Sequence, residues 1–170
     1  MPGILQIYCG TMKSVDNAET LYFGIAELLK FVENEGTKWK WALQRMGEAM
    51  DIYGEGEFMG MPVWEFGNYV NTLEDGVNLS WEYLRVFSTQ IKTIWWGIYV
   101  ACKDEIYFTR LKGLFLDEWC YIDRAEEEYY KFTELVFQET EGGWLIYAKD
   151  DALLECIASA FSDAQTLRVW

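Results

Sequence analysis

The 170-residue sequence contains no histidine, and it has only 14 lysines and arginines against 28 aspartates and glutamates. Without histidine, Ser-His-Asp and Cys-His triads, HExxH zinc sites and Glu-x-x-His di-iron sites are excluded. Neither G-x-G-x-x-G nor G-x-x-x-x-G-K-[ST] is present, and the acidic loop around Gly54, Gly56 and Gly60 would repel a phosphate. We therefore expect a protein that is not an enzyme and that holds no cofactor and no metal.

Long apolar runs, linkers and repeats are missing too. The richest apolar run, Ile94–Cys102, has nine residues, whereas a membrane-spanning helix needs about 18 or more. The N-terminal sequence MPGILQIYCGTMK lacks a basic leader followed by an apolar core and a cleavage site. With only two prolines and no Gly/Ser-rich seam, residues 1–170 are predicted to form a single globular domain. We expect it to be cytoplasmic and without a membrane partner.

The four cysteines are far apart and form no C-x-x-C pair: Cys9, Cys102, Cys120 and Cys156. Free cysteine is among the most buried residue types and packs like a small apolar side chain. We expect four buried cysteines rather than a disulfide framework. A zinc site built from all four is the alternative, although zinc ligands usually come in close sequence pairs.

The hydrophobic pattern predicts an α+β fold, with an antiparallel or mixed central sheet, an N-terminal helical pair and two further helices packed on it. Runs rich in apolar, β-branched and aromatic residues predict strands at Gly3–Cys9, Ile94–Cys102, Glu105–Leu111, Leu114–Ile122, Trp144–Ala148 and Thr166–Trp170. Caps and helical spacing predict helices over residues 16–36, 37–54, 63–73, 123–141 and 150–161. A helix capped by Ser80 or Asn78 competes with a strand after residue 80.

Tryptophan is unusually frequent, with nine residues. Five of them fall in predicted helix or strand registers, where burial of a large ring explains them: Trp39, Trp41, Trp95, Trp96 and Trp144. Trp95 and Trp96 are adjacent, so on a strand they would point to opposite faces. Trp64 and Trp81 flank acid-rich sequence with weak periodicity, and no core role is predicted for them.

The acidic residues are concentrated in the segment Gly47–Tyr83, which holds eight of them and no lysine or arginine. We call residues 47–83 the acidic segment. A second acidic group, over residues 117–128, is partly explained by a predicted helix N-terminus, where negative charge is favourable. Uncompensated like charges cost stability, so the acidic segment is better explained if a basic partner binds there. The predicted partner-binding residues are Glu55, Glu57, Phe58, Trp64, Glu65, Asp75, Trp81 and Glu82.

In size, acidity, lack of histidine, aromatic content and α+β texture, the chain resembles the small acidic immunity proteins that bacteria pair with secreted or contact-delivered toxins. The resemblance is one of composition over the whole chain, and no motif carries it. It implies a non-enzymatic inhibitor that covers the active site of a basic toxin, often a nuclease, with acidic side chains in place of substrate phosphates. Phage-encoded inhibitors of defence proteins have a similar character and are an alternative.

Two other classes stay open at this point. Glycoside hydrolysis needs two carboxyl groups beside aromatic rings, and Asp117 and Glu118 beside Trp119, or Glu65 beside Trp64, are the candidates for a carbohydrate-binding or carbohydrate-processing cleft. The third class is a structural domain whose acidic surface only confers solubility. In every class the negative surface disfavours binding to nucleic acid.

Overall fold

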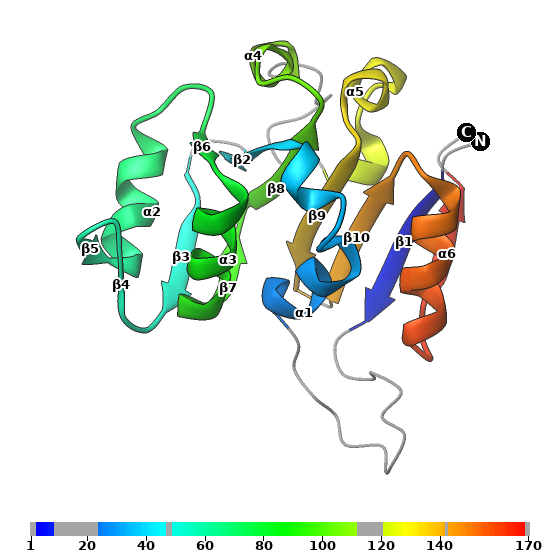
Figure 1. Ribbon diagram of the computed structural model, residues 1–170, viewed down its shortest axis with the longest axis horizontal. Helices are drawn as coiled ribbons and strands as arrows, with labels where there is room; N and C mark the ends of the chain where they lie inside the picture. The colour runs from blue at the N-terminus through cyan, green and yellow to red at the C-terminus, as the bar shows by residue number, and fades with distance from the viewer. Residues whose placement is uncertain (1–2, 9–23, 47–48, 112–120, 142, 169–170) are drawn as a thin grey trace.

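A computed structural model of the chain describes residues 3–8, 24–46, 49–111, 121–141 and 143–168. Its centre is a seven-stranded sheet with the strand order β11-β1-β10-β9-β8-β2-β6, in which every neighbouring pair is antiparallel (Figure 1). The strands are β1 (Gly3–Tyr8), β2 (Lys40–Arg45), β6 (Val77–Leu79), β8 (Gly97–Cys102), β9 (Leu135–Thr140), β10 (Gly143–Ala148) and β11 (Gln165–Arg168). The predicted α+β class is confirmed, and the sheet is antiparallel rather than mixed.

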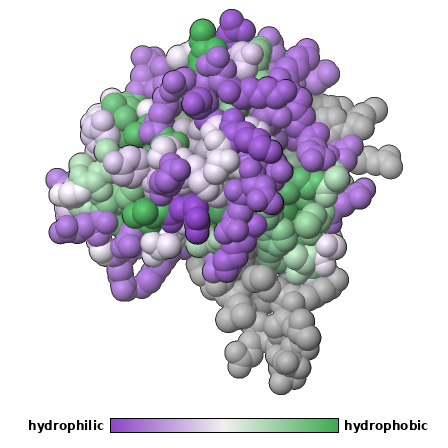
Figure 2. All heavy atoms as spheres, viewed as in Figure 1, coloured by the Kyte–Doolittle hydropathy of each residue, from purple (hydrophilic) through white to green (hydrophobic). Residues whose placement is uncertain are grey.

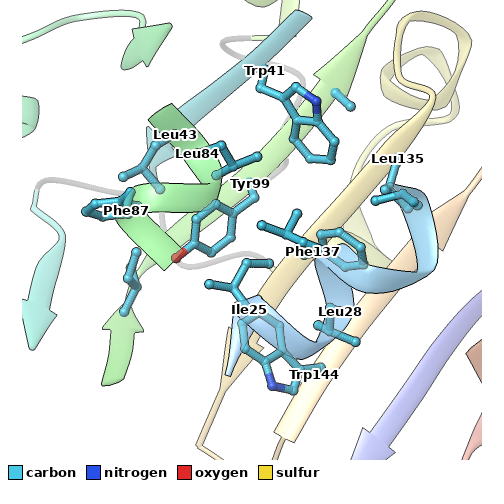
Figure 3. Packing of buried hydrophobic residues seen from close by; sticks show 14 of the residues in the cluster. Ile25, Leu28, Trp41, Leu43, Leu84, Phe87, Tyr99, Leu135, Phe137 and Trp144 are labelled. Atoms are coloured by element: carbon cyan, nitrogen blue, oxygen red, sulfur yellow. The ribbon is translucent and has the colours of Figure 1, made fainter. Parts of the chain in front are cut away.

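One face of the sheet is covered by α1 (Ile25–Leu29), by α3 (Trp81–Gln90) and by α6 (Asp151–Ala160). We call the cluster of buried side chains on this face the first core. Alternate strand residues point into it, among them Trp41, Tyr99, Phe137 and Trp144, which are all nearly fully buried. Figure 3 shows these rings beneath the side chains of α1 and α3. Trp41 also donates a hydrogen bond from Nε1 to the carbonyl of Gly36, 2.9 Å away.

The other face is covered by α4 (Ile106–Leu111), by a 3-10 turn at Ile122–Arg124 and by α5 (Glu127–Phe132). We call the cluster of buried side chains on this face the second core. It includes Val100, Cys102, Val136 and Tyr147. Because both faces are covered, the central strands are buried on both sides, and all six residues of β8 and of β10 are buried. Within the described residues, no helix has the length and apolar character needed to cross a membrane.

A smaller unit lies beside the sheet at one end of the molecule (Figure 1). It consists of the two-stranded ribbon of β3 (Asp51–Gly54) and β7 (Ile91–Trp95), the short hairpin of β4 (Glu57–Phe58) and β5 (Met61–Pro62), and α2 (Val63–Asn71). The side-chain amide of Asn71 holds α2 to the start of the ribbon, because it accepts from the backbone N–H of Met50 at 2.8 Å and donates to its carbonyl at 2.9 Å.

The ribbon is joined to the main sheet by the carboxylate of Glu139 on β9. Its Oε2 accepts a hydrogen bond from the backbone N–H of Ile94 at 2.8 Å, and its Oε1 accepts one from Oγ1 of Thr93 at 2.5 Å. Ile52 and Ile94, which face each other in the ribbon, are buried in the first core. The opposite side of the ribbon carries the exposed residues Asp51, Tyr53 and Trp95 and the half-buried Thr93.

Several predicted elements are confirmed. Strands are present at β1, β10 and β11, and the helix predicted at 63–73 is α2. Ser80 caps α3 by accepting from the N–H of Tyr83 at 3.2 Å, and Asp150 caps α6 by accepting from the N–H of Ala152 at 2.9 Å. The helix alternative after residue 80 is therefore the correct one.

The helix predicted at 37–54 is wrong, and with it the N-terminal helical pair. These residues form a 3-10 turn at Gly36–Lys38 followed by β2 and β3. Trp41 and Leu43 enter the first core while Ala42 enters the second, so the strand is apolar on both faces. A continuous apolar run of this kind matches helical spacing as well as strand spacing. In the described part of the first predicted helix, residues 24–36, the structure contains α1 and the 3-10 turn Lys30–Val32.

Three further boundaries differ from the prediction. The run 105–111 is the helix α4 rather than a strand, and the run 94–102 is divided into β7 and β8 at Trp96. The helix predicted from Asp123 is α5, with Glu126 at its N-cap, and Leu135 and Val136 already belong to β9. The capping box at Asp16 and Glu19 and most of the strand predicted at 114–122 lie outside the described residues.

Candidate functional site

The described part of the acidic segment, residues 49–83, supplies β3, the β4–β5 hairpin, α2, β6 and the first turn of α3. Phe58 joins these elements, since its ring centroid lies 4.8 Å from that of Phe66 on α2, 5.0 Å from that of Phe87 on α3 and 6.2 Å from that of Tyr83. Figure 2 shows a mainly hydrophilic face with hydrophobic side chains at the end that holds α2 and the hairpin. The acidic segment therefore forms one packed surface rather than a loose tail.

Asp51, Glu57, Glu65 and Glu82 have exposed side chains and make no ion pair with any other residue that the structure describes. Glu55 is different. Its carboxylate accepts a hydrogen bond from the ammonium of Lys92, and this bond and the positive charge hold the pKa of Glu55 below its usual value.

Asp75 lies half-buried after α2, and its backbone carbonyl accepts a hydrogen bond from Nε2 of Gln44 at 3.1 Å. Two of the exposed carboxylates have a local role, because Glu65 and Glu82 lie in the first turns of α2 and α3. Negative charge is favourable there by about 0.3 to 1 kcal/mol. The ion pair of Lys92 with Glu55 and the N-termini of α2 and α3 thus offset part of the repulsion among these carboxylates. Asp51 and Glu57 have no such compensation among the described residues.

Two of the three aromatic residues predicted to bind a partner are buried. Phe58 is 3% exposed and Trp81 is 8% exposed, and both belong to the first core. The ring of Trp81 lies 5.8 Å from that of Trp41 and covers Gly36, where a Cβ would come within 2.4 Å of it. Trp64 is 60% exposed on α2 and is the only one of the three that is open to a partner.

The structure exposes a set of aromatic rings that lie within the predicted helix 37–54 and the predicted strand 94–102. Tyr53, Trp95 and Trp96 are 47%, 49% and 43% exposed. The rings of Tyr53 and Trp95 lie 5.4 Å apart, and those of Trp95 and Trp96 lie 6.0 Å apart. We call these three residues the aromatic cluster. Tyr53 and Trp95 lie on the outer side of the β3–β7 ribbon, opposite Ile52 and Ile94, and Trp96 follows directly after β7.

Both adjacent tryptophans are exposed because the chain does not continue as a regular strand between them. Trp96 has a φ of 57°, in the left-handed region, and the next residue is Gly97. A Cβ at Gly97 would lie 2.5 Å from Cγ2 of Ile94 and from Sδ of Met50, so only glycine fits this close approach. The Trp-Trp-Gly sequence was the available signal for this break.

The four cysteines do not behave as one group. Cys102 is buried as predicted, whereas Cys156 is exposed on α6, which corrects the expectation for that residue. Cys9 and Cys120 lie outside the described residues. Burial, together with the negative charge of Glu134, raises the pKa of Cys102 to about 12, so this thiol stays protonated and is a poor nucleophile at neutral pH.

The carbohydrate candidates gain little from the geometry. Asp117, Glu118 and Trp119 lie outside the described residues, and Trp64 and Glu65 are neighbours on the exposed side of α2. In the part of the chain that the structure describes, no group of three or more histidine, cysteine, aspartate or glutamate side chains is arranged to hold a metal ion.

Comparison with known proteins finds no matching family model, no matching curated protein and no matching solved structure. The function therefore has to be argued from the surface itself.

Proposed function

We propose that this protein is a non-enzymatic inhibitor that binds a basic protein partner through the acidic segment. The simplest case is an immunity protein that covers the active site of a cognate toxin, such as a nuclease, inside the cytoplasm. The observation that carries the proposal is the set of carboxylates on Glu57, Glu65 and Glu82, which are exposed and have no ion pair among the described residues.

Each residue has a defined part in this proposal. Glu57 and Glu65 contact lysine or arginine side chains of the partner, and Glu82 extends the negative surface onto α3. Trp64, which is 60% exposed beside Glu65, is the aromatic anchor, since interface energy is concentrated in a few large rings surrounded by polar residues. Phe58 and Trp81 act indirectly, because they pack the hairpin and α3 onto the core.

The charge balance of the whole chain agrees with this role. A net charge of −14 repels nucleic acid and anionic lipid and attracts a strongly basic protein. Electrostatic attraction accelerates association more than it strengthens the final complex. An inhibitor that must reach a toxin before the toxin reaches its substrate benefits from this acceleration.

The identity of the partner is tested by affinity capture from the native cell, followed by expression of the captured protein with and without this chain. We expect the captured protein to be basic and toxic when it is expressed alone, and harmless when the two are expressed together. A captured protein that shows no toxicity, or whose toxicity this chain does not relieve, contradicts the proposed function.

The site is tested by charge reversal with that partner. The variant Glu57→Lys, Glu65→Lys, Glu82→Lys is expected to associate about tenfold more slowly at low salt and to lose most of its salt dependence. The matched control is Glu127→Lys, Glu128→Lys, Glu155→Lys, which changes the net charge equally and also alters two residues in the first turn of a helix, α5. Equal effects in the two variants would remove the acidic segment from the interface.

A further inference from the structure

We propose that the aromatic cluster is a binding site for an arginine side chain of a basic protein partner. In this site the guanidinium group lies against the ring of Trp95, beside Tyr53, and pairs with the carboxylate of Asp51. The inference rests on the proposed function only in the basic character of the partner. It assigns a second contact surface, on the outer side of the β3–β7 ribbon.

The positions of the three side chains follow from the strand register. Asp51 is directly opposite Trp95 in the antiparallel ribbon, and Tyr53 lies two residues further along the same strand. Directly opposed residues project from the same face with Cβ atoms about 4.5 to 5.5 Å apart. A carboxylate and two rings are therefore gathered on one exposed face, and the core side chains Ile52 and Ile94 occupy the other.

The relative orientation of the rings favours a small cation over a large ligand such as a sugar. The planes of Tyr53 and Trp95 meet at 61°, and those of Trp95 and Trp96 meet at 71°, so both pairs are in edge-to-face contact. The cluster therefore does not present one continuous plane of the kind on which a sugar stacks best. A cation within about 6 Å of a ring centroid is attracted to the face of the ring, and arginine is the commonest protein cation at such sites.

The carboxylate of Asp51 supplies the negative charge that a cation needs. One basic residue, Arg45, ends β2 opposite the residue that directly follows Trp96. Asp51 is exposed and makes no ion pair with another described residue. The nearest lysine on the ribbon, Lys92, already pairs with Glu55. Arginine is favoured over lysine because its planar guanidinium group can stack on a ring and donate two hydrogen bonds to a carboxylate, and because it is more weakly hydrated.

The backbone conformation at Trp96 is a further observation that supports a functional role for the aromatic cluster. On a regular strand, Trp95 and Trp96 would point to opposite faces. The left-handed conformation of Trp96, which is unfavourable for a bulky residue, keeps both rings at the surface. Unfavourable backbone conformations of this kind are concentrated at functional sites.

The site can be tested on the full chain without the natural partner. The probe is the capped tripeptide Gly-Arg-Gly, titrated into ¹⁵N-labelled protein while the indole N–H signals of the tryptophans are followed by NMR. We expect saturable shifts of the Trp95 signal, identified by its loss in Trp95→Phe, with an affinity in the millimolar range. Asp51→Asn should weaken the affinity about two- to fivefold, because it removes the ion pair and keeps the side-chain size.

Trp39 provides the internal control, because it is half-buried and lies outside both the cluster and the acidic segment. Its signal should not move. The proposal is overturned if the neutral isostere Gly-citrulline-Gly shifts Trp95 equally, if Trp39 responds as strongly as Trp95, or if cellobiose binds at Trp95 and the arginine peptide does not.

The peptide experiment and the charge-reversal experiment test the two proposals independently. If the arginine peptide does not bind but reversal at Glu57, Glu65 and Glu82 slows association with the captured partner, only the arginine site is lost. If the peptide binds as expected and the captured protein is basic but not toxic, the proposed function is lost and the arginine site stands.

Discussion

At the scale of single residues, Met59 and Trp96 combine two unfavourable features. They are the two non-glycine residues with positive φ in the described part of the chain, at 54° and 57°, and their side chains are 56% and 43% exposed. Met59 and Gly60 form the two-residue turn of the β4–β5 hairpin, and Gly60 also has a positive φ, of 78°. Such turns strongly prefer asparagine or glycine at the first position.

The turn residue gives a prediction about stability. Met59→Asn is expected to raise the free energy of unfolding by about 1 kcal/mol, because asparagine tolerates the left-handed conformation and the methionine side chain is largely exposed. Urea unfolding followed by circular dichroism measures the change. Met59→Ala removes the side chain but keeps the unfavourable conformation, so its stability should stay close to that of the original chain. Equal stabilisation by alanine and asparagine would contradict the conformational explanation.

At the scale of secondary-structure elements, the position of the β3–β7 ribbon depends on contacts that bridge elements distant in sequence. Glu139 of β9 holds Thr93 and Ile94 of β7 through two hydrogen bonds. The carboxylate is charged, and hydrogen bonds to charged groups contribute about 1.5 to 3 kcal/mol each. The ribbon carries Asp51 and the aromatic cluster, so the same carboxylate fixes where the candidate surface lies relative to the sheet.

Removal of this link should loosen the ribbon. Glu139→Ala is expected to lower the free energy of unfolding by about 2 kcal/mol, because the N–H of Ile94 loses its acceptor while the surroundings stay partly buried. Amide hydrogen exchange should accelerate most at Ile94 and its neighbours in β7. Glu141→Ala, two residues further on and exposed, serves as the control. It should change the free energy of unfolding by no more than about 0.5 kcal/mol and should leave amide exchange in β7 unchanged.

At the scale of the whole molecule, both faces of the sheet carry a core, and the second core contains ionisable groups held in their neutral form. Tyr147 donates from its hydroxyl to the carbonyl of Tyr130 at 3.2 Å, and Cys102 is fully buried nearby in the same core. Burial is the main cause that raises the pKa of Cys102 to about 12 from 9.0, and that of Tyr147 to about 12 from 10.0. In the unfolded chain the same groups lose their protons at lower pH.

The second core therefore predicts loss of stability in alkali. The folded state binds more protons than the unfolded state between pH 9.0 and about 12 for Cys102, so this contribution is complete below pH 9.0 and is lost as the pH rises. In Cys102→Ala, the free energy of unfolding should fall less steeply in this range, by up to about 1.4 kcal/mol per pH unit. Urea unfolding at several pH values measures the slope. Cys156→Ala, on the exposed side of α6, should keep the original slope.

The sequence indicated helices correctly where a capping side chain is followed by apolar residues at helical spacing. Ser80 and Asp150 are capping residues followed by helical spacing, and α3 and α6 begin as these caps indicate. The same reasoning failed at Trp41, whose neighbours are buried on both faces of the sheet, so that no period could be recognised. It also failed at Trp81, because the core above Trp41 is assembled from elements distant in sequence.

The candidate site was predicted in part. The concentration of carboxylates and the exposure of Trp64 agree with the sequence reasoning, whereas Phe58 and Trp81 are core residues. The pairing of Glu55 with Lys92 could not be read from the sequence, because the two residues meet only when β3 and β7 form a ribbon.

By itself the sequence determined the negative charge, the absence of histidine chemistry, the α+β class and the helices that carry their own caps, because these depend on composition or on a few neighbouring residues. Only the tertiary structure decided which apolar runs became strands, which acids were left without a partner among the described residues, and which rings reached the surface. Those outcomes depend on what packs against each residue. The left-handed turn at Trp96 shows the difference most directly, since it leaves the ring of Trp96 at the surface beside Trp95, while Gly97 packs closely on Met50 and Ile94.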